Sequence, residues 1–264
     1  MRRSVVLAGA FSAITLAATV FGGAVADAST AHYVALGDSY SSGVGSGSYD
    51  LSSSCDRSSA AYPALYKAAT APSVFTFVAC TGATASDIES SQLSSLNSST
   101  TLVSVTDGGN DAGFTTIMED CILESDSGCT SAINSAESYV QNTLPGVLHT
   151  LYSDIRADSP GAHVVVVGYP EFYDLSQSSG CIGLDTTKRT ALDGAADDLD
   201  STLSGVVGGF SDFSYADVRS HFAGHQLCDS SPWLHSLNFG DLTESYHPTA
   251  AGQQAYLAAF ESGV

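Results

Sequence analysis

Positively charged side chains are scarce in this sequence. Its 264 residues include 8 Lys and Arg against 28 Asp and Glu, and the only lysines are Lys67 and Lys188. So few cations cannot form a basic patch, and a net charge of −20 repels nucleic-acid phosphates and anionic lipid headgroups. The composition therefore predicts no nucleic-acid partner and no electrostatic docking on anionic membranes, and it favours solubility outside the cell.

Metal-binding spacings are also missing. No C-x-x-C pair occurs, so a common zinc arrangement is unavailable. His221 and His225 are four residues apart, but Gly224 between them disfavours the helix that would bring both rings to one face. Four aspartates do not match a calcium loop and are expected on a solvated helix face: Asp193, Asp197, Asp198 and Asp200. The sequence therefore predicts no metal ion and no other cofactor.

The longest hydrophobic run lies at the N-terminus. Two arginines precede an apolar stretch over residues 5–26, and a small-residue cleavage site ends at Ala28. This order is typical of a secretory signal peptide, which we assign to residues 1–28. A permanent membrane anchor is the alternative. Residues 29–264 are then enough for one α/β domain with a sizeable core.

Six cysteines follow this segment, and an even count in an exported chain predicts three disulfides. Sequence alone leaves many pairings open. We expect nearest neighbours to pair, which gives Cys55–Cys80, Cys121–Cys129 and Cys181–Cys228. Each bond would restrict the unfolded chain and stabilise the fold by about 2 to 4 kcal/mol.

Five short apolar or β-branched segments predict strands, and helical patterns separate them. The expected strands cover residues 33–36, 74–79, 101–106, 162–168 and 213–218. The expected helices cover residues 60–70, 131–155, 185–207 and 249–260. Pro145 makes the second helix either one kinked helix or two abutting ones, and residues 121–129 should form a small looped hairpin before it. This alternation predicts an α/β fold with a parallel five-stranded sheet covered on both faces.

The motif Gly37-Asp38-Ser39 directly follows the first expected strand. Ser39 should therefore lie on a turn at the carboxyl end of the sheet, where open α/β folds bind ligands. Backbone N–H groups at the start of the next helix are unpaired and partly positive, which suits a serine whose attack creates an oxyanion. An ordinary polar turn is the alternative, and we predict Ser39 to be a nucleophile.

Two further strand ends carry groups that can stabilise an oxyanion. Gly82 follows the second strand and can offer its backbone N–H, although a plain turn glycine is the alternative. Asn110 follows the third strand, and its neutral amide can donate a hydrogen bond, although it could instead cap a helix. Because the carboxyl ends of parallel strands share one edge, we expect both to meet Ser39 there.

A late histidine completes this set. His247 precedes Pro248 at the start of the last expected helix, from which its ring can reach the same edge of the sheet. A nucleophile, a general base and an oxyanion hole made by the Ser39 and Gly82 N–H groups and the Asn110 side chain are the parts needed for acyl transfer.

These motifs resemble, in the same order, the four sequence blocks of the SGNH (GDSL-type) hydrolases. The matching positions are Gly37-Asp38-Ser39, Gly82, Gly108-Gly109-Asn110-Asp111 and His247-Pro248. The resemblance covers the chain after the signal segment and is greatest to the secreted actinomycete lipases and phospholipases A1. It implies a three-layer α/β/α flavodoxin-like sandwich and serine esterase chemistry without a metal.

One position departs from the family pattern. Members usually carry aspartate three residues before the histidine, and this chain has Glu244 there. Its extra methylene can carry the carboxylate past the ring nitrogen. We therefore predict a Ser39–His247 dyad whose imidazole is oriented by a backbone carbonyl near Glu244 or Ser245.

The expected substrate is a lipid ester, and the expected protein is a secreted monomer that contacts lipid surfaces transiently. Alternatives are a short-chain or carbohydrate acetyl esterase, a phosphodiester-cleaving relative, and a non-catalytic secreted binding protein. Loops at residues 41–59 and 172–184 should shape the site, the first either as a wall of its mouth or as an exposed linker. Four aromatic residues could line an acyl groove or belong to the core: Tyr40, Phe114, Tyr169 and Phe172.

Overall fold

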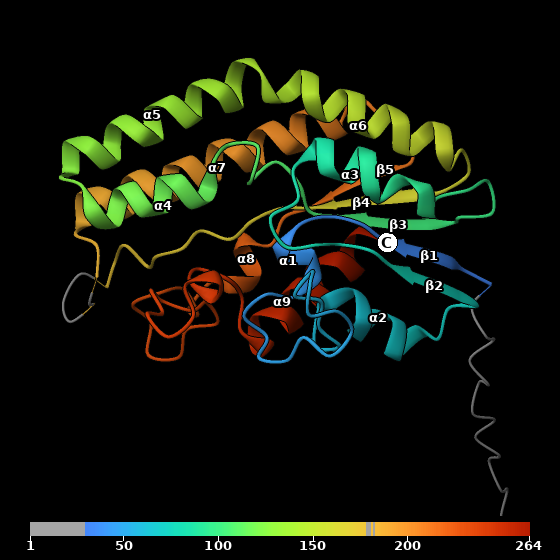
Figure 1. Ribbon diagram of the computed structural model, residues 1–264, viewed down its shortest axis with the longest axis horizontal. Coiled ribbons are helices and arrows are strands. Elements are labelled where there is room, and N and C mark those ends of the chain that lie inside the picture. The colour runs from blue at the N-terminus through green and yellow to red at the C-terminus, as the bar shows by residue number, and fades with distance from the viewer. Residues whose placement is uncertain (1–29, 178–180, 182) are drawn as a thin grey trace, which may run out of the picture.

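A parallel sheet of five strands forms the centre of the molecule (Figure 1). The computed structural model describes residues 30–177, 181 and 183–264, and its strand order is β2-β1-β3-β4-β5. The strands are β1 (His32–Ala35), β2 (Val74–Phe77), β3 (Leu102–Val105), β4 (His163–Val167) and β5 (Phe213–Ala216). Every pairing between them is parallel. The predicted sheet is confirmed, although each strand ends one or two residues earlier than its sequence pattern suggested.

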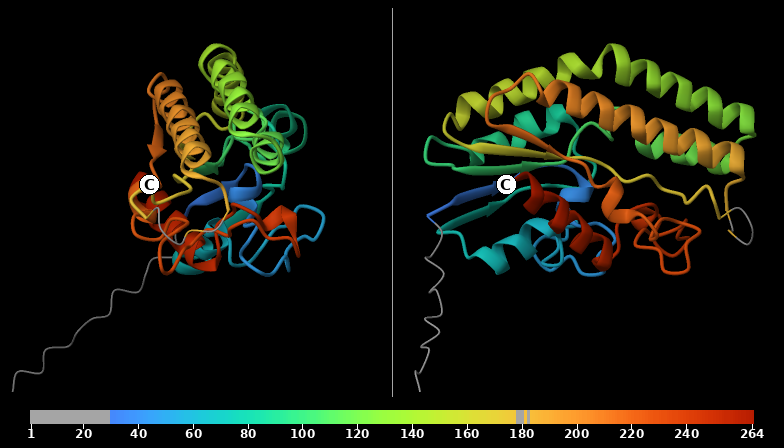
Figure 2. Two further views of the ribbon diagram at one scale, coloured as in Figure 1. Left: turned by 90° about the vertical axis from the view of Figure 1, so that its left-hand side faces the viewer. Right: turned by 180° about the vertical axis from the view of Figure 1, so that it is seen from behind.

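Helices cover both faces of this sheet, which gives the expected three layers (Figures 1 and 2). One layer contains α3 (Ala85–Ser91), α4 (Phe114–Leu123), α5 (Asp126–Asn142), α6 (Leu144–Asp158) and α7 (Thr186–Val207). The other contains α2 (Tyr62–Thr70), α8 (Arg219–Phe222) and α9 (Ala250–Gly263), while α1 (Ser39–Ser42) follows β1. The central strands β3 and β4 are nearly all buried, which explains their continuous apolar runs.

Three helices extend past the sheet. Figure 1 shows α4 and the first turns of α5 and α7 projecting beyond the carboxyl ends of the strands. These helices therefore cover the edge at which the sequence predicts a functional site.

The segment expected as one kinked helix or two abutting ones contains two helices. α5 ends at Asn142 and α6 begins at Leu144, with Pro145 in the first turn of α6. A proline is tolerated there because the N–H it lacks would have no partner within the helix.

The hairpin predicted at residues 121–129 is wrong. Cys121 lies in α4 and Cys129 in α5, so these residues form the corner between two helices. The reason is a helix start that comes earlier than expected. Ser125 caps α5, and its Oγ accepts a hydrogen bond from the Gly128 N–H (3.4 Å).

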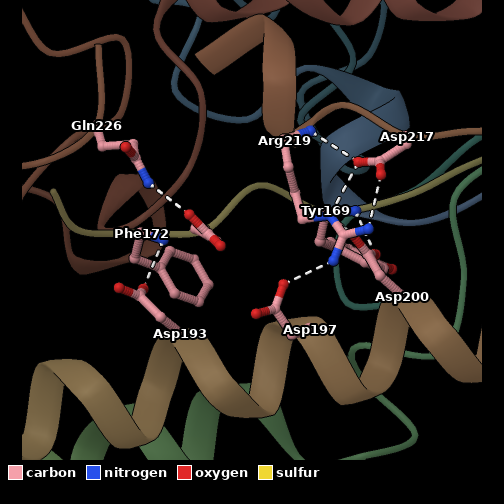
Figure 3. A network of polar contacts seen from close by, with 9 residues as sticks. Tyr169, Phe172, Asp193, Asp197, Asp200, Asp217, Arg219 and Gln226 are labelled. Carbon is pink, nitrogen blue, oxygen red and sulfur yellow. Dashed lines mark hydrogen bonds and ion pairs between the residues drawn. The ribbon is translucent and has the colours of Figure 1, made fainter. Parts of the chain in front are cut away.

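Two of the four aspartates expected on a solvated face of α7 are buried instead (Figure 3). Asp193 Oδ1 accepts a hydrogen bond from the Phe172 N–H (2.8 Å), and Asp200 Oδ1 accepts one from the Tyr169 N–H (2.9 Å). Burial raises the pKa of both carboxyl groups to about 7. The expectation of a solvated position therefore holds only for Asp197 and Asp198, which are half-buried. Asp193 and Asp200 instead hold the segment that follows β4 against α7.

Three disulfides join nearest neighbours along the chain: Cys55–Cys80, Cys121–Cys129 and Cys181–Cys228. Within the described part of the chain, no helix is long and apolar enough to cross a membrane. The expected signal peptide, residues 1–28, lies outside the described residues.

Candidate active site

Ser39 lies on a sharp turn between β1 and α1. Gly37 has a φ of 124°, and a Cβ there would lie only 2.6 Å from the Thr106 carbonyl oxygen, so this position requires glycine. Asp38 then caps α1, because its Oδ1 accepts a hydrogen bond from the Tyr40 N–H (2.9 Å). Ser39 is the first residue of the helix and lies at the carboxyl end of the sheet.

His247 contacts Ser39 directly. Its Nε2 lies 2.7 Å from the Ser39 Oγ, and its Nδ1 lies 3.0 Å from the Ser245 carbonyl oxygen. Since a carbonyl only accepts, Nδ1 carries the proton and donates it, which leaves Nε2 free to accept the hydroxyl proton of Ser39. The tautomer required of a general base is thus set by a main-chain oxygen.

Glu244 is engaged elsewhere. Its Oε1 accepts a hydrogen bond from the Tyr49 hydroxyl (2.8 Å), and that hydroxyl accepts one from the Gly45 N–H (3.1 Å). The His235 ring also lies against this loop, with Nε2 2.7 Å from the Gly45 carbonyl oxygen. The loop at residues 41–59 is therefore attached to the His247 segment, although none of its residues lines the cleft or the cavity beside Ser39.

The pH dependence of turnover should reflect the burial of His247. Burial lowers the pKa of the imidazole to about 4, although the hydrogen bond to Ser245 opposes this shift. The neutral ring is the base, so it should stay active as the pH falls until the pH reaches that value. We expect the acid limb of kcat/KM on a soluble ester to fall near pH 4, below the ordinary histidine value of about 6.5.

This profile should be measured from pH 3.5 to 9 after checking that the protein survives preincubation at each pH. A limb near pH 6 would contradict the lowered pKa of His247, since it would match either an imidazole with the ordinary histidine pKa or Asp38, whose pKa is raised to about 6 by burial.

The two expected oxyanion donors lie in the same cleft as Ser39 and His247. Gly82 has a φ of 74° and is exposed, and a Cβ placed there would meet nothing within 4 Å, so the space beside this residue is open. The Asn110 Nδ2 donates one hydrogen bond to the Ala83 carbonyl oxygen (3.0 Å). An amide nitrogen has two hydrogens, so this bond orients the group and leaves one hydrogen for a ligand.

Asn110 does not cap a helix. α4 begins only at Phe114, and the residue at its N-cap is Gly113. The next residue, Asp111, accepts hydrogen bonds from the Ala85 N–H at the start of α3 (3.3 and 3.0 Å). The alternative role considered for Asn110 is therefore removed.

The cleft adjoins a smaller apolar cavity. The cleft has a volume of about 500 Å³ and contains Ser39, Gly82, Asn110 and His247 in its walls. The cavity has a volume of about 60 Å³ and extends under α7. Both are lined by Ser39, Asn110 and Phe114, so they meet at the reacting hydroxyl. The four aromatic residues all line the cavity, and three are also buried in the core: Tyr40, Tyr169 and Phe172.

Sequence reasoning missed the side chains that hold the nucleophile turn. The Tyr169 hydroxyl donates a hydrogen bond to Asp38 Oδ2 (2.5 Å), and the Thr106 hydroxyl donates one to Asp38 Oδ1 (2.5 Å). Asp200 in turn binds the Tyr169 backbone, as Figure 3 shows. The turn that carries Ser39 is thus connected through Tyr169 to α7.

One of the paired histidines outside the site, His225, has structural partners. His225 Nδ1 lies 2.8 Å from the Ser231 carbonyl oxygen, and its ring stacks on Trp233 with centroids 3.5 Å apart. Over residues 30–177, 181 and 183–264, no group of three or more His, Cys, Asp or Glu side chains could hold a metal ion.

Comparison with known proteins places the chain in a family. Residues 35–255 match the model of the GDSL-like lipase/acylhydrolase family. The chain is 52% identical over 257 residues to Lipase 1 of Streptomyces coelicolor, which covers 94% of each protein. It is 48% identical over 232 residues to a lipase of Streptomyces rimosus, covering 87% of this chain and 85% of that one.

Solved structures agree with this assignment. A phospholipase A1 from Streptomyces albidoflavus NA297 superimposes with a TM-score of 0.85 at 49% identity, over 89% of this chain and 99% of the other. An extracellular lipase from Streptomyces rimosus has a TM-score of 0.85 at 46% identity, over 89% and 100%. The resemblance inferred from the sequence motifs is confirmed, and the chain is a carboxylic ester hydrolase of the GDSL-like lipase/acylhydrolase family.

Proposed function

We propose that this protein is a secreted lipase or phospholipase A1 that cleaves lipid esters through a Ser39 acyl-enzyme. The contact of 2.7 Å between the Ser39 Oγ and His247 Nε2 carries this proposal, because it pairs a nucleophile with a base beside an apolar cavity. The names of the relatives, lipases and a phospholipase A1, favour a lipid substrate.

The reaction follows from these positions. His247 Nε2 takes the Ser39 proton as Oγ attacks the ester carbonyl. The oxyanion accepts hydrogen bonds from the Ser39 and Gly82 N–H groups and from Asn110 Nδ2. The bond to the alcohol then breaks, and the ring returns its proton to the leaving oxygen. The same ring next deprotonates a water molecule, which attacks the acyl-enzyme, releases the fatty acid and restores Ser39.

The two hollows suit the two parts of a lipid ester. The cavity under α7 is narrow and lined by apolar side chains such as Leu192, Ala196 and Leu199, and its volume of about 60 Å³ suits the first few carbons of an acyl chain. The cleft is wider and also contains Thr81, Thr243 and Ser245, which matches the glycerol part with its remaining substituents. The ester carbonyl would lie where the two meet, at Ser39.

Loss of the Glu244 carboxylate should affect catalysis only mildly, because the Ser245 carbonyl orients the imidazole. We expect Glu244→Ala to lower kcat by less than about tenfold, against the ~10⁴-fold loss known for alteration of a true triad acid. The residual effect should come from the Tyr49 contact. Steady-state kinetics on a soluble ester would measure it.

Tyr49→Phe is the matched control, since it removes the same hydrogen bond from the other side. If the loop contact is the whole role of Glu244, the double variant should be no slower than the slower single variant. A loss near 10⁴-fold in Glu244→Ala alone would rule out the dyad.

Product analysis tests the substrate. Phosphatidylcholine with different chains at its first and second positions should be offered beside a triglyceride. A lysophospholipid that keeps the second chain would support phospholipase A1 activity, and free fatty acid from the triglyceride would support lipase activity. Cleavage of only short-chain or acetylated carbohydrate esters would favour the alternative esterase, and failure of a fluorophosphonate to label Ser39 would favour a binding protein.

We also propose that residues 1–28 are removed on export and that residues 29–264 act outside the cell as a monomer. The three disulfides and the extracellular relative from Streptomyces rimosus support export.

A further inference from the structure

The most exposed large apolar side chains gather at the mouth of the cleft. Phe239, Leu123 and Leu242 are 84%, 79% and 64% exposed, more than any other large apolar residue described. All three also line the cleft that contains Ser39 and His247. Leu123 is the last residue of α4, whereas Phe239 and Leu242 belong to the segment before His247.

These two segments come from different layers of the fold. Figure 1 shows α4 above the sheet and the orange-red segment that contains residues 237–245 below it, both beyond the carboxyl ends of the strands. Scattered single apolar residues on a surface need no explanation, but a group around one opening marks a site of contact.

We propose that Leu123, Phe239 and Leu242, here called the apolar rim, insert into the surface of a lipid aggregate and turn the cleft toward the ester bonds there. This inference rests on the proposed function, because it takes the substrate to be an aggregated lipid. It adds which residues meet the surface and which kind of surface they meet.

The charges beside the apolar rim select that surface. Glu119 and Glu124 are exposed next to Leu123, and Asp241 is exposed next to Leu242. Lys188 lies near the end of α4, but it is buried and its Nζ donates to the Cys121 and Glu124 carbonyl oxygens (2.9 and 2.7 Å). The rim is therefore flanked by negative charge, which fits zwitterionic or uncharged lipid and disfavours anionic lipid.

Vesicle binding without turnover gives a direct test. In a Ser39→Ala background, Leu123→Ser/Phe239→Ser/Leu242→Ser should be compared with the parent for sedimentation with phosphatidylcholine vesicles. Removing these side chains should weaken binding by about tenfold or more, since burial of even one such side chain shifts an equilibrium by that factor. Because all three are exposed, the fold should persist, and Phe239→Ser alone should reproduce part of the loss if the triple variant does not fold.

The matched control replaces three exposed apolar residues that line neither the cleft nor the cavity. Leu51→Ser/Val74→Ser/Leu175→Ser makes the same kind of change at positions that are 48%, 44% and 42% exposed, so it removes less apolar surface than the rim variant does. This control should bind vesicles as the parent does. Equal binding by the rim variant, or equal weakening by the control, would overturn the proposal.

Two further arms separate the inference from its premise. With Ser39 present, the ratio of rates on phosphatidylcholine vesicles and on soluble p-nitrophenyl butyrate should fall about tenfold in the rim variant and not in the control. Vesicles of phosphatidylglycerol at low salt should bind the parent more weakly than phosphatidylcholine, and tighter binding would overturn the choice of surface. A failure of the proposed function would appear separately, as a parent protein that binds vesicles but hydrolyses no lipid.

Discussion

His247→Ala is expected to lower kcat on a soluble ester by about 10⁴-fold or more. Without the imidazole, no group accepts the Ser39 proton, and a neutral hydroxyl attacks esters very slowly. Ser39→Ala should cause a loss of similar size. Since the two residues act as one unit, the double variant should be no slower than the single variants, and kcat of all three is the measurement.

His235→Gln is the appropriate control for this loss. The His235 ring lies against the Gly45 carbonyl oxygen (2.7 Å) and not against Ser39, so its replacement perturbs the loop and leaves the proton acceptor in place. We expect this variant to keep kcat within about tenfold of the parent, as a substitution outside a reacting unit should. Activity above a tenth of the parent value in His247→Ala would show that another group serves as the base.

Asn110→Ala should reduce kcat by about 10² to 10³ with little change in KM. The amide is oriented by its bond to Ala83, so its second hydrogen is aimed before substrate arrives. A donor of this kind stabilises the charged oxygen of the transition state far more than the neutral carbonyl of the substrate. Parallel losses in kcat and kcat/KM, measured under steady-state conditions, would indicate that difference.

Asn142→Ala controls for the loss of an amide as such. Its Nδ2 donates to the Ser138 carbonyl oxygen (2.8 Å) on the exposed side of α5, and Asn142 lines neither the cleft nor the cavity. This variant should turn over substrate at the parent rate. Near-normal kcat in Asn110→Ala would remove Asn110 from the oxyanion hole, and a rise in KM alone would make it a group that binds the ground state.

The strand ends could be predicted because their chemistry is local. Four residues of apolar sequence before Gly37 identify a buried strand, and a glycine with positive φ must end it. Parallel topology then brings Ser39, Gly82 and Asn110 to one edge without further information. The close approach of His247, 208 positions away in sequence from Ser39, followed from the same edge and from the order of the family motifs.

Other features depend on packing that a local pattern does not carry. The corner at residues 121–129 looked like a hairpin because two cysteines close in sequence suggest a small loop, whereas two helices can also bring them together. The partner of Glu244 could not be assigned either, since Tyr49 is 195 positions away. Nothing in the sequence pattern around Tyr49 or Glu244 predicts that the two side chains form a hydrogen bond.

The buried aspartates of α7 did leave a signal. Asp193 and Asp200 are seven residues apart, so they lie on one face of the helix, and Leu192 and Leu199 repeat the same spacing beside them. An aspartate that repeats at the same spacing as neighbouring leucines lies on the face of the helix that packs against the core. The prediction treated all four aspartates as one acidic cluster, although only Asp193 and Asp200 follow this periodicity.

The main-chain oxygen of Ser245 has a consequence for the environments in which the enzyme can operate. A carboxylate that orients an imidazole becomes protonated at low pH, and its hydrogen bond to the ring N–H then weakens. A backbone carbonyl oxygen does not titrate, so the orientation of the ring does not depend on pH. The hydrogen bond that orients the ring would therefore not depend on pH, and activity in acid would be limited by protonation of the imidazole itself, near pH 4.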